Sequence, residues 1–541
     1  MVVSPGPAKL ALTILLLLGG CAGDGAPPET TPAPTSAASA PPTIPEAKPD
    51  SPGQSTELSG LLEDVKSVAQ ELPARPRPTE IAVPDGRAAA AKIAARPAGT
   101  EVGYLMVDLE TGYVMAELNP DLPLIPASTA KLATAVVALD VLGPDYVYLT
   151  ELLADGDLED GVLRGDLILR GGGDPALDVA DLLELAVQLE NLGIYRVDGR
   201  FLIDDTVFPV LSEIDPRQPA EAAYNPGIGA LSVAFNRVRV AWRGGSARNA
   251  ITLPPLEEAR FESVSPAELS RSGFDLEDMG DEAVVWRVAD RGGRRQRASL
   301  PVKDPGLHAG RVFRQLALAQ GIALEQPQRV TAPVGAVVLA VHRSMALRYL
   351  VRDMLVYSNN MMAEMIGLST AARLSNDVAS LQAAGALMVR HLSQLMPEID
   401  WSTAALGNHS GLDGAARLTP RQLAAIAQYG WRSDTLPALL PGGGWSGTLS
   451  DRFSGPDEAL RVWAKTGTLN YGSSLAGFLF PASGRPAVFA TMVSDVGART
   501  SYDATPRPRR VGESSAGRWL ARARALQDGL IQSWLKPLPT S

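Results

Sequence analysis

Apolar residues recur along this chain with two different spacings, and each spacing predicts one type of secondary structure. Short or alternating apolar runs bounded by turn residues predict strands at residues 103–108, 113–117, 461–468, 474–480 and 487–494. Apolar residues three or four positions apart predict helices at residues 126–143, 345–357, 361–372, 381–395, from 419 onward and 515–535. Two opening strands, a helical middle, three strands and a last helix indicate one α+β domain. Its sheet would combine early and late strands.

The pattern changes between about residues 155 and 335, where short apolar runs alternate with Gly, Asp and Pro turns. Strands are predicted there at residues 162–169, 197–203, 228–240 and 284–288. This stretch is expected to form one or more β-rich subdomains inserted into the first domain. That first domain would then comprise residues 81–154 and 336–541.

The N-terminal 21 residues indicate a targeting segment rather than part of the fold. A weakly basic start is followed by an apolar run at residues 10–18, which is too short to span a bilayer as a permanent helix. Cys21, the only cysteine, lies directly after this run and a few small residues. The arrangement resembles a bacterial lipobox, in which Cys21 would be lipidated. An ordinary signal peptide with an incidental cysteine is the alternative.

Residues 22–80 are expected to form a disordered tether that carries one short helix. Pro, Ala, Ser and Thr dominate residues 22–54 and cannot bury enough apolar surface to fold. Leucines and valines between residues 58 and 72 mark one face of an amphipathic helix. A lipid on Cys21 would thus hold the folded part at a membrane facing the periplasm. Ala22, rather than Asp, favours the outer membrane by analogy with lipoprotein sorting.

Composition and charge exclude several classes of function. The chain has 541 residues, of which 45% are hydrophobic and 20% charged, as in a soluble globular protein. Its net charge of −11, without any basic block, argues against nucleic-acid binding. Four histidines and one cysteine leave little material for a metal centre built by the protein, so no metal is expected.

Ser128 and Lys131 stand three residues apart at the start of an apolar helix, which places them on one face. A serine hydroxyl becomes a useful nucleophile when a base removes its proton. A lysine can be that base if burial lowers its pKa towards neutrality. The same spacing recurs at Ser533 and Lys536, but no helix follows that copy, and we interpret it as coincidental.

Two further motifs indicate the type of enzyme to which Ser128 and Lys131 would belong. Ser358-Asn359-Asn360 lies between two predicted helices, and Lys465-Thr466-Gly467-Thr468 lies on a predicted strand. Each motif alone is compatible with a structural role, such as a helix cap, an Asn turn or an edge-strand lysine. Ser-x-x-Lys, Ser-x-Asn and Lys-Thr-Gly in this order are the signature of serine penicillin-recognising enzymes.

The spacing of the motifs narrows the resemblance, because 230 residues separate Ser128 from Ser358. Between about residues 88 and 497 the chain resembles the class C low-molecular-mass penicillin-binding proteins, the D-alanyl-D-alanine carboxypeptidase/endopeptidase family. Further shared segments are Gly165-Asp166-Leu167, Gly172-Gly173-Asp174-Pro175, Asp204-Asp205 with Phe208, Asn236, Ser410-Gly411-Leu412 and Gly447-Thr448-Leu449. The chain departs from the family at Asn408-His409, where Asp-Gly is frequent, and at Asn359, where Asp is frequent.

The resemblance implies a β-lactamase/transpeptidase-like domain, with an antiparallel sheet covered by helices on both sides. It also implies a serine DD-peptidase that acts on peptidoglycan stems and is inhibited by β-lactam antibiotics. Ser128 would attack the carbonyl of the penultimate D-Ala, and Lys131 would accept the proton. Ser358 would pass a proton to the leaving amine, while Asn360 would orient Lys131 and bind the peptide.

The resemblance assigns the Lys-Thr-Gly-Thr strand to substrate binding. Lys465, Thr466 and Thr468, with Gly467 between the two threonines, would attract the terminal carboxylate. The backbone amides of Ser128 and Thr468 would form the oxyanion hole. No metal or organic cofactor is required by this scheme.

Three alternatives remain open at this point. A Ser-His-Asp hydrolase finds no Gly-x-Ser-x-Gly motif beside the four histidines, His308, His342, His391 and His409. His409, the one near a family motif, is expected at the surface or behind the site. A non-catalytic wall-binding lipoprotein on the same fold is a second alternative. A β-lactamase or esterase on the same scaffold is the third.

Overall fold

The computed structural model describes residues 93, 96 and 98–536, apart from 220, 244–250, 254–259, 265–273, 279–283, 290–294, 483 and 506–512. The predicted signal segment with Cys21, the tether at 22–80 and its helix lie outside the described residues. Every described residue belongs to one unit of the chain, Ala82–Ser541.

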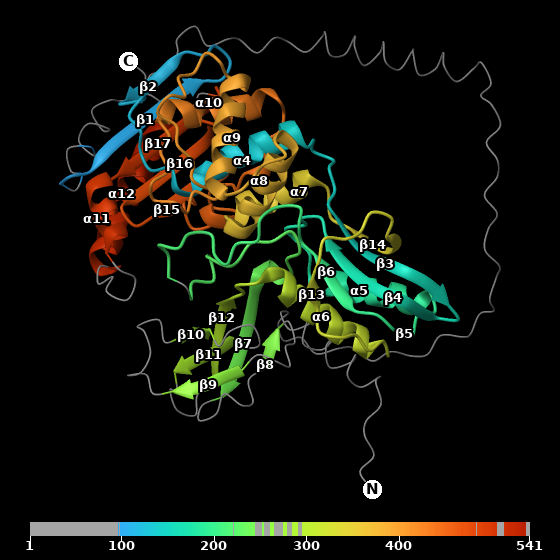
Figure 1. The fold of residues 1–541 in the computed structure, drawn as a ribbon. Coiled ribbons are helices and arrows are strands. Elements are labelled where there is room, and N and C mark those ends of the chain that lie inside the picture. The colour runs from blue at the N-terminus through green and yellow to red at the C-terminus, as the bar shows by residue number, and fades with distance from the viewer. Residues whose placement is uncertain are drawn as a thin grey trace, which may run out of the picture. The chain divides into compact units, whose positions relative to one another are not determined.

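A five-stranded antiparallel sheet joins early and late parts of the sequence. Its strand order is β15-β16-β17-β1-β2. The bounds are Glu101–Asp108 for β1, Val114–Leu118 for β2, Val462–Leu469 for β15, Gly472–Leu479 for β16 and Ala487–Ser494 for β17. Strand β1 pairs with β17 over its whole length, so the first strands lie beside the last ones, blue beside red in Figure 1. The predicted sheet of early and late strands is confirmed.

Helices cover both faces of this sheet because its side chains alternate between two apolar layers. Leu105 faces the core shared with α4 and α10, whereas its neighbour Tyr104 packs its ring 5.5 Å from that of Trp534 on α12. The helices are α4 (Lys131–Val141), α7 (Leu347–Tyr357), α8 (Asn360–Leu374), α9 (Leu381–Leu395), α10 (Pro420–Arg432), α11 (Val496–Ala504) and α12 (Glu513–Leu535). The predicted α+β class, with an antiparallel sheet between helices, is confirmed.

Helix α10 begins as the sequence indicates, whereas the predicted helix 126–143 opens with a 3-10 turn and becomes α-helical only at Lys131. Thr419 caps α10 by accepting a hydrogen bond from the Gln422 amide, with Pro420 in the first turn. Helix α4 is preceded by a 3-10 turn, η1 (Ala127–Ala130), and nine of its residues are buried. Helix α11 was not predicted. Among the described helices, none is both long enough and apolar enough to cross a membrane.

A second sheet is formed mainly by the stretch predicted to be an insertion. Its strands run in the order β13-β6-β4-β3-β14, with β5 paired to β4. The bounds are Leu149–Glu159 for β3, Val162–Gly171 for β4, Arg196–Val197 for β5, Phe201–Asp204 for β6, Gln328–Arg329 for β13 and Val337–Arg343 for β14. Strands β3 and β14 therefore extend this sheet beyond residues 155 and 335.

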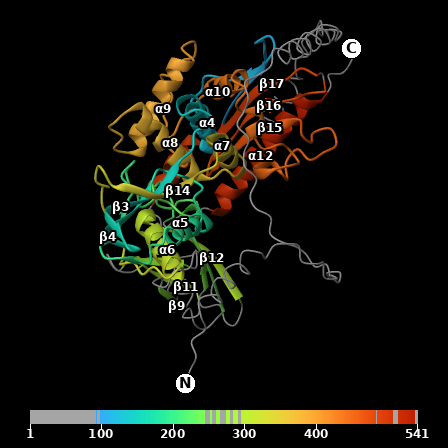
Figure 2. The same cartoon turned by 90° about the vertical axis from the view of Figure 1, so that its right-hand side faces the viewer.

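The same stretch contains two helices that the strand-like interpretation missed. Helix α5 (Val179–Asn191) and helix α6 (Pro305–Ala319) pack against the second sheet, as Figures 1 and 2 both show. The buried residues Leu182, Leu185, Ala186 and Leu189 have helical spacing, so the signal was present in the sequence. The strand predicted at 228–240 is also wrong in part, since β7 begins only at residue 237.

Two small three-stranded sheets contain the remaining described strands of this stretch. Their strand orders are β12-β7-β8 and β10-β11-β9. The bounds are Arg237–Arg243 for β7, Ile251–Leu253 for β8, Arg260–Val264 for β9, Phe274–Asp278 for β10, Val284–Ala289 for β11 and Arg295–Pro301 for β12.

Candidate active site

Ser128 lies in the η1 turn, directly before α4. The turn is held by Thr129, whose hydroxyl donates to the Pro126 carbonyl at 2.7 Å. Strand β15 reaches the turn at Gly467, where an added Cβ would collide with the Pro126 carbonyl oxygen. The close approach of strand and serine therefore requires a residue without a side chain at 467.

Lys131 is fully buried one turn after the serine. Its Nζ lies 3.0 Å from the Ser128 Oγ, 2.8 Å from the Asn360 Oδ1 and 2.8 Å from the Ser410 carbonyl oxygen. Burial lowers the pKa of Lys131 from 10.5 to about 7, although the Glu364 carboxylate opposes the shift. Near neutral pH a large fraction of this lysine is therefore uncharged.

These three contacts match the bonding capacity of a neutral amine. A neutral lysine has two N–H donors and one lone pair. The carbonyl oxygens of Asn360 and Ser410 can only accept, so they take up both N–H groups. The remaining lone pair is then available to the Ser128 hydroxyl proton. This arrangement is what a general base for the serine requires.

Glu364, on α8, fixes the loop that carries the Ser410 carbonyl. The acid is fully buried, and its carboxylate accepts hydrogen bonds from the backbone amides of His409 and Ser410, both at 2.9 Å. Burial raises the pKa of Glu364, while these donors and Lys131 favour its charged form. No motif in the sequence marks this residue. An isolated acid inside the predicted helix 361–372 was the available signal.

His409 lies behind the site rather than at the surface, the second of the two positions expected for it. The residue is 1% exposed, and neither ring nitrogen has a hydrogen-bond partner among the described residues. Burial lowers the pKa of His409 to about 3, so the ring is neutral near physiological pH. Gly367 makes room for it, because an added Cβ there would collide with the imidazole ring.

Ser358 ends α7 with a backbone φ of 55°, a left-handed conformation that lets the chain turn into α8. Its hydroxyl accepts a hydrogen bond from the Lys465 Nζ at 2.8 Å, and the same Nζ donates to the Thr466 carbonyl at 2.8 Å. Lys465 is fully buried, and its pKa is lowered well below 10.5 by burial and by the Lys131 charge. Each buried lysine thus forms a hydrogen bond with one serine of the site, Lys131 with Ser128 and Lys465 with Ser358.

A cleft of about 560 Å³ opens in front of these groups. Its walls include Ser128, Ser358 and Asn360 together with the side chains of Thr466 and Thr468 from β15. Lys131 and Lys465 lie beneath this surface rather than on it. The structure therefore brings all the predicted catalytic and binding residues of the folded part to one place.

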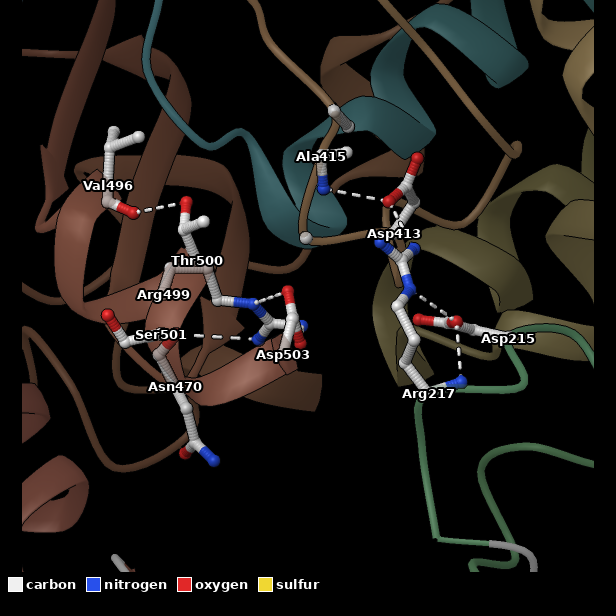
Figure 3. A network of polar contacts seen from close by, with 12 residues as sticks. Asp215, Arg217, Asp413, Ala415, Asn470, Val496, Arg499, Thr500, Ser501 and Asp503 are labelled. Carbon is white, nitrogen blue, oxygen red and sulfur yellow. Dashed lines mark hydrogen bonds and ion pairs between the residues drawn. The ribbon is translucent and has the colours of Figure 1, made fainter. Parts of the chain in front are cut away.

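The stretch between β6 and β7 contributes to the cleft, which the sequence did not reveal. Gln218 and Tyr224 line it, and the Asn360 Nδ2 donates to the Tyr224 carbonyl at 3.0 Å. Figure 3 shows Arg217 reaching from this stretch to Asp413, which follows the Ser410-Gly411-Leu412 segment. These contacts tie the inserted stretch to the catalytic loops.

Arg499 and Asp503 form a second ion pair in Figure 3, with N–O distances of 2.7 and 2.8 Å. Arg499 is buried and also borders the cleft. An added Cβ on Gly414 would collide with its guanidinium, so the glycine permits this position.

The competing candidates lie elsewhere. The Ser533 hydroxyl donates to the Leu530 carbonyl within α12 at 2.6 Å, and Ser533 does not line the cleft. None of the four histidines lines it either. Among the described residues, Ser358 is the one further serine that contacts a buried lysine with a lowered pKa.

Comparison with known proteins decides the family. Residues 87–507 match the D-Ala-D-Ala carboxypeptidase 3 (S13) family. The chain belongs to this family. A carboxypeptidase of Mycobacterium tuberculosis is 29% identical over 433 residues, covering 77% of this chain and 82% of that protein. The D-alanyl-D-alanine carboxypeptidase DacB of Haemophilus influenzae is 25% identical over 433 residues, covering 74% and 86%.

Solved structures agree with this S13 assignment at the level of the fold. The crystal structure of penicillin-binding protein 4 from Haemophilus influenzae superimposes with a TM-score of 0.69 at 22% identity, covering 82% of this chain and 99% of that one. The same protein in complex with a β-lactam gives a TM-score of 0.67 at 20% identity, covering 83% and 99%. The predicted penicillin-binding-protein family and its transpeptidase-like fold are confirmed.

The family assignment also confirms that this S13 chain is a serine D-Ala-D-Ala peptidase. The non-catalytic wall-binding alternative and the β-lactamase or esterase alternative find no support in the comparisons.

Proposed function

We propose that this enzyme hydrolyses D-Ala-D-Ala termini or D-Ala crosslinks of peptidoglycan stems through an acyl-enzyme on Ser128. The supporting observation is the buried amine of Lys131, whose two N–H groups have carbonyl partners and whose lone pair faces the Ser128 hydroxyl at 3.0 Å. Ser358 also lines the cleft beside a buried lysine, but the Nζ of that lysine has one carbonyl partner, that of Thr466, where Lys131 has two.

The first half-reaction begins with transfer of the Ser128 proton to the Lys131 Nζ. The Ser128 Oγ bonds to the carbonyl carbon of the penultimate D-Ala, and the C–N bond to the last D-Ala then breaks. The leaving amine takes a proton through the Ser358 hydroxyl, which Lys465 orients from below. Water next attacks the ester carbonyl while the Lys131 Nζ takes one of its protons, and the Ser128 Oγ regains that proton as the shortened stem leaves. Atoms and protons balance without a cofactor.

Developing charge on the carbonyl oxygen needs stabilisation during both steps. The backbone amides of Ser128 and Thr468 are the proposed donors, since β15 lies against the η1 turn at Gly467. One such donor typically contributes about 3–4 kcal/mol to lowering the barrier. Asn360 holds Lys131 and is itself held by the Tyr224 carbonyl.

Intact-mass analysis after exposure to penicillin tests the nucleophile. We expect one adduct on the wild-type enzyme and none on Ser128→Ala. Equal labelling of both proteins would contradict the assignment, and an adduct mapped to Ser533 would identify the other motif as the site. Slow loss of the adduct separates a peptidase from a β-lactamase, which would turn penicillin over.

Mass spectrometry of products from purified muropeptides then distinguishes the two peptidase activities. Loss of a terminal D-Ala from monomeric stems indicates carboxypeptidase action. Conversion of crosslinked dimers to monomers indicates endopeptidase action. If the wild-type enzyme forms neither product, the proposed substrate class is wrong.

The inserted stretch, about residues 155–335, is proposed to position peptidoglycan near the cleft and to supply no catalytic group. This proposal is supported by Gln218 and Tyr224, which line the cleft beside Asn360. Replacing the stretch by a short linker should change the preference between monomeric and crosslinked muropeptides while leaving some penicillin labelling. A nucleophile or base mapped inside the stretch would contradict the proposal.

We also propose a lipoprotein anchored through Cys21 and facing the periplasm, with the outer membrane favoured. The support is the lipobox-like sequence, the lone cysteine and the following Ala22. Several acyl chains make such attachment stable, whereas one binds only marginally. Fractionation of cells that express wild type or Cys21→Ser, with radiolabelled fatty acid, tests this. A soluble, unlabelled chain cleaved elsewhere would indicate a plain signal peptide.

A further inference from the structure

Two hydroxyl groups of strand β15, those of Thr466 and Thr468, line the cleft, and the Thr466 hydroxyl already donates to the Thr448 hydroxyl at 2.8 Å. Thr466 and Thr468 are two positions apart on β15, so their side chains point to the same face of the strand. The Thr468 Oγ1 accepts a hydrogen bond from Arg524 Nη2 at 3.0 Å. The Thr468 hydroxyl hydrogen therefore remains free to donate, and any group that binds it must be a hydrogen-bond acceptor.

The cation that faces this position is Arg524 of α12. Lys465, which the family pattern assigns to the terminal carboxylate, is fully buried and donates to Ser358 and to the Thr466 carbonyl. It does not line the cleft, whereas Arg524 does. A guanidinium stays protonated at all physiological pH values, so its charge is permanent.

Arg524 forms no ion pair among the described residues, although the Asp528 carboxylate one helical turn along α12 favours its charged form. The neighbouring Arg452, which lines the same cleft, forms an ion pair with Asp528 through its Nε at 3.0 Å. No carboxylate of the described residues forms an ion pair with Arg524, which donates a hydrogen bond to the Thr468 hydroxyl. The cleft therefore presents a cation without an ion pair beside the Thr468 hydroxyl, whose hydrogen is free to donate, a combination that suits a carboxylate.

From this geometry we infer that Arg524 is a specificity-determining residue that binds the free carboxylate of the substrate together with Thr468. The inference rests on the proposed function and deepens it: the favoured substrates are acyl-D-Ala compounds whose leaving group carries a carboxylate next to the scissile bond. Removal of the arginine should weaken recognition of the anion and leave the acylation chemistry at Ser128 intact.

Penicillin and its methyl ester form a matched pair of probes, because they share the reactive ring and differ in the carboxylate. Second-order rate constants for acylation are measured by intact mass with the wild-type chain. Arg524→Ala should lower the constant for benzylpenicillin about 10- to 100-fold, the loss expected for a charge-assisted contact. The constant for the methyl ester should change by less than about twofold, as no charged contact is removed.

Two control variants sharpen the comparison. Arg524→Lys keeps the charge but loses the planar fork, so its rate with benzylpenicillin should lie between those of wild type and Arg524→Ala. Arg522→Ala removes an exposed arginine of the same helix that does not line the cleft, and both rates should stay unchanged. Added salt should slow benzylpenicillin more in wild type than in Arg524→Ala.

The possible failures are distinct. If Arg524→Ala slows the acid and the ester equally, the arginine acts through the structure of the strand, and the inference is overturned. It is also overturned if neither rate changes. If the wild-type enzyme is acylated by neither compound, the proposed function itself is wrong. A fall confined to the acid supports both.

Discussion

The rate of Ser128 acylation should rise with pH, with a midpoint near 7, if Lys131 is the base. The perturbation is a change of pH from 6 to 8, applied to the folded enzyme. A protonated Lys131 has no lone pair for the serine proton, so the reactive population is the neutral fraction. Burial lowers the pKa of Lys131 to about 7, which places this titration inside the accessible range.

The size of the effect follows from the pKa. With a value of about 7, the neutral fraction is about a tenth at pH 6, half at pH 7 and nine tenths at pH 8, an increase of about tenfold. An ordinary lysine with a pKa of 10.5 would be neutral only about 3 times in 10,000 at pH 7. The folded environment of Lys131 thus favours the neutral amine by about 5 kcal/mol, the net result of burial and the opposing Glu364 charge.

The assay is quenched-flow acylation followed by intact mass, at several pH values and low penicillin concentration. Benzylpenicillin and its methyl ester should show the same midpoint, because Lys131 acts on the serine and not on the carboxylate. A midpoint present only with the acid would instead indicate titration of a carboxylate-binding group. Lys131→Ala should show no acylation at any pH.

A rate that is constant between pH 6 and 8, or that falls as pH rises, would refute the reasoning for Lys131. A midpoint near 10 would show that the folded protein does not depress the lysine pKa, and that the amine is hydrated in solution.

Other variants test the groups around the base. Glu364→Gln removes the carboxylate that raises the pKa of Lys131, so the midpoint of acylation should move to lower pH, read from the same profiles. Because the folded pKa of Lys131 is lowered, the unfolded chain binds more protons between about pH 7 and 10.5. The free energy of unfolding of the wild type should therefore rise with pH in that window. Urea unfolding at pH 7 and 9 should show a smaller rise in Lys131→Met, which lacks the titrating amine. Gly467→Ala should abolish penicillin labelling and cost about 1–3 kcal/mol of stability through overpacking, whereas Gly517→Ala on α12, with open space around it, should not. Lys465→Ala should slow acylation by benzylpenicillin and by its ester alike, since Lys465 holds Ser358; a loss confined to the acid would assign it to the carboxylate instead.

Local patterns in the sequence were enough to predict the elements with a clear apolar face. The predicted strand 487–494 and helix 381–395 coincide with β17 and α9, because their buried residues repeat with the period of one regular structure. The three motifs also predicted the family without any contact information, since the order of motifs is a property of the chain. Helices α5 and α6 were not predicted, although α5 has the same kind of periodicity. The Gly, Asp and Pro turns around them are typical of a β-rich segment and favoured strands.

The tertiary structure decided the chemistry of the site. The pKa of Lys131 depends on burial and on partners 229 and 279 residues away along the chain, Asn360 and Ser410, which no local pattern connects. Glu364 and Arg524 likewise act through contacts that exist only once distant segments are packed together. The sequence determined which reactive groups are present and in which order. Packing determined which of them lose water, and therefore which lysine lies beneath each serine and which cation remains in the cleft.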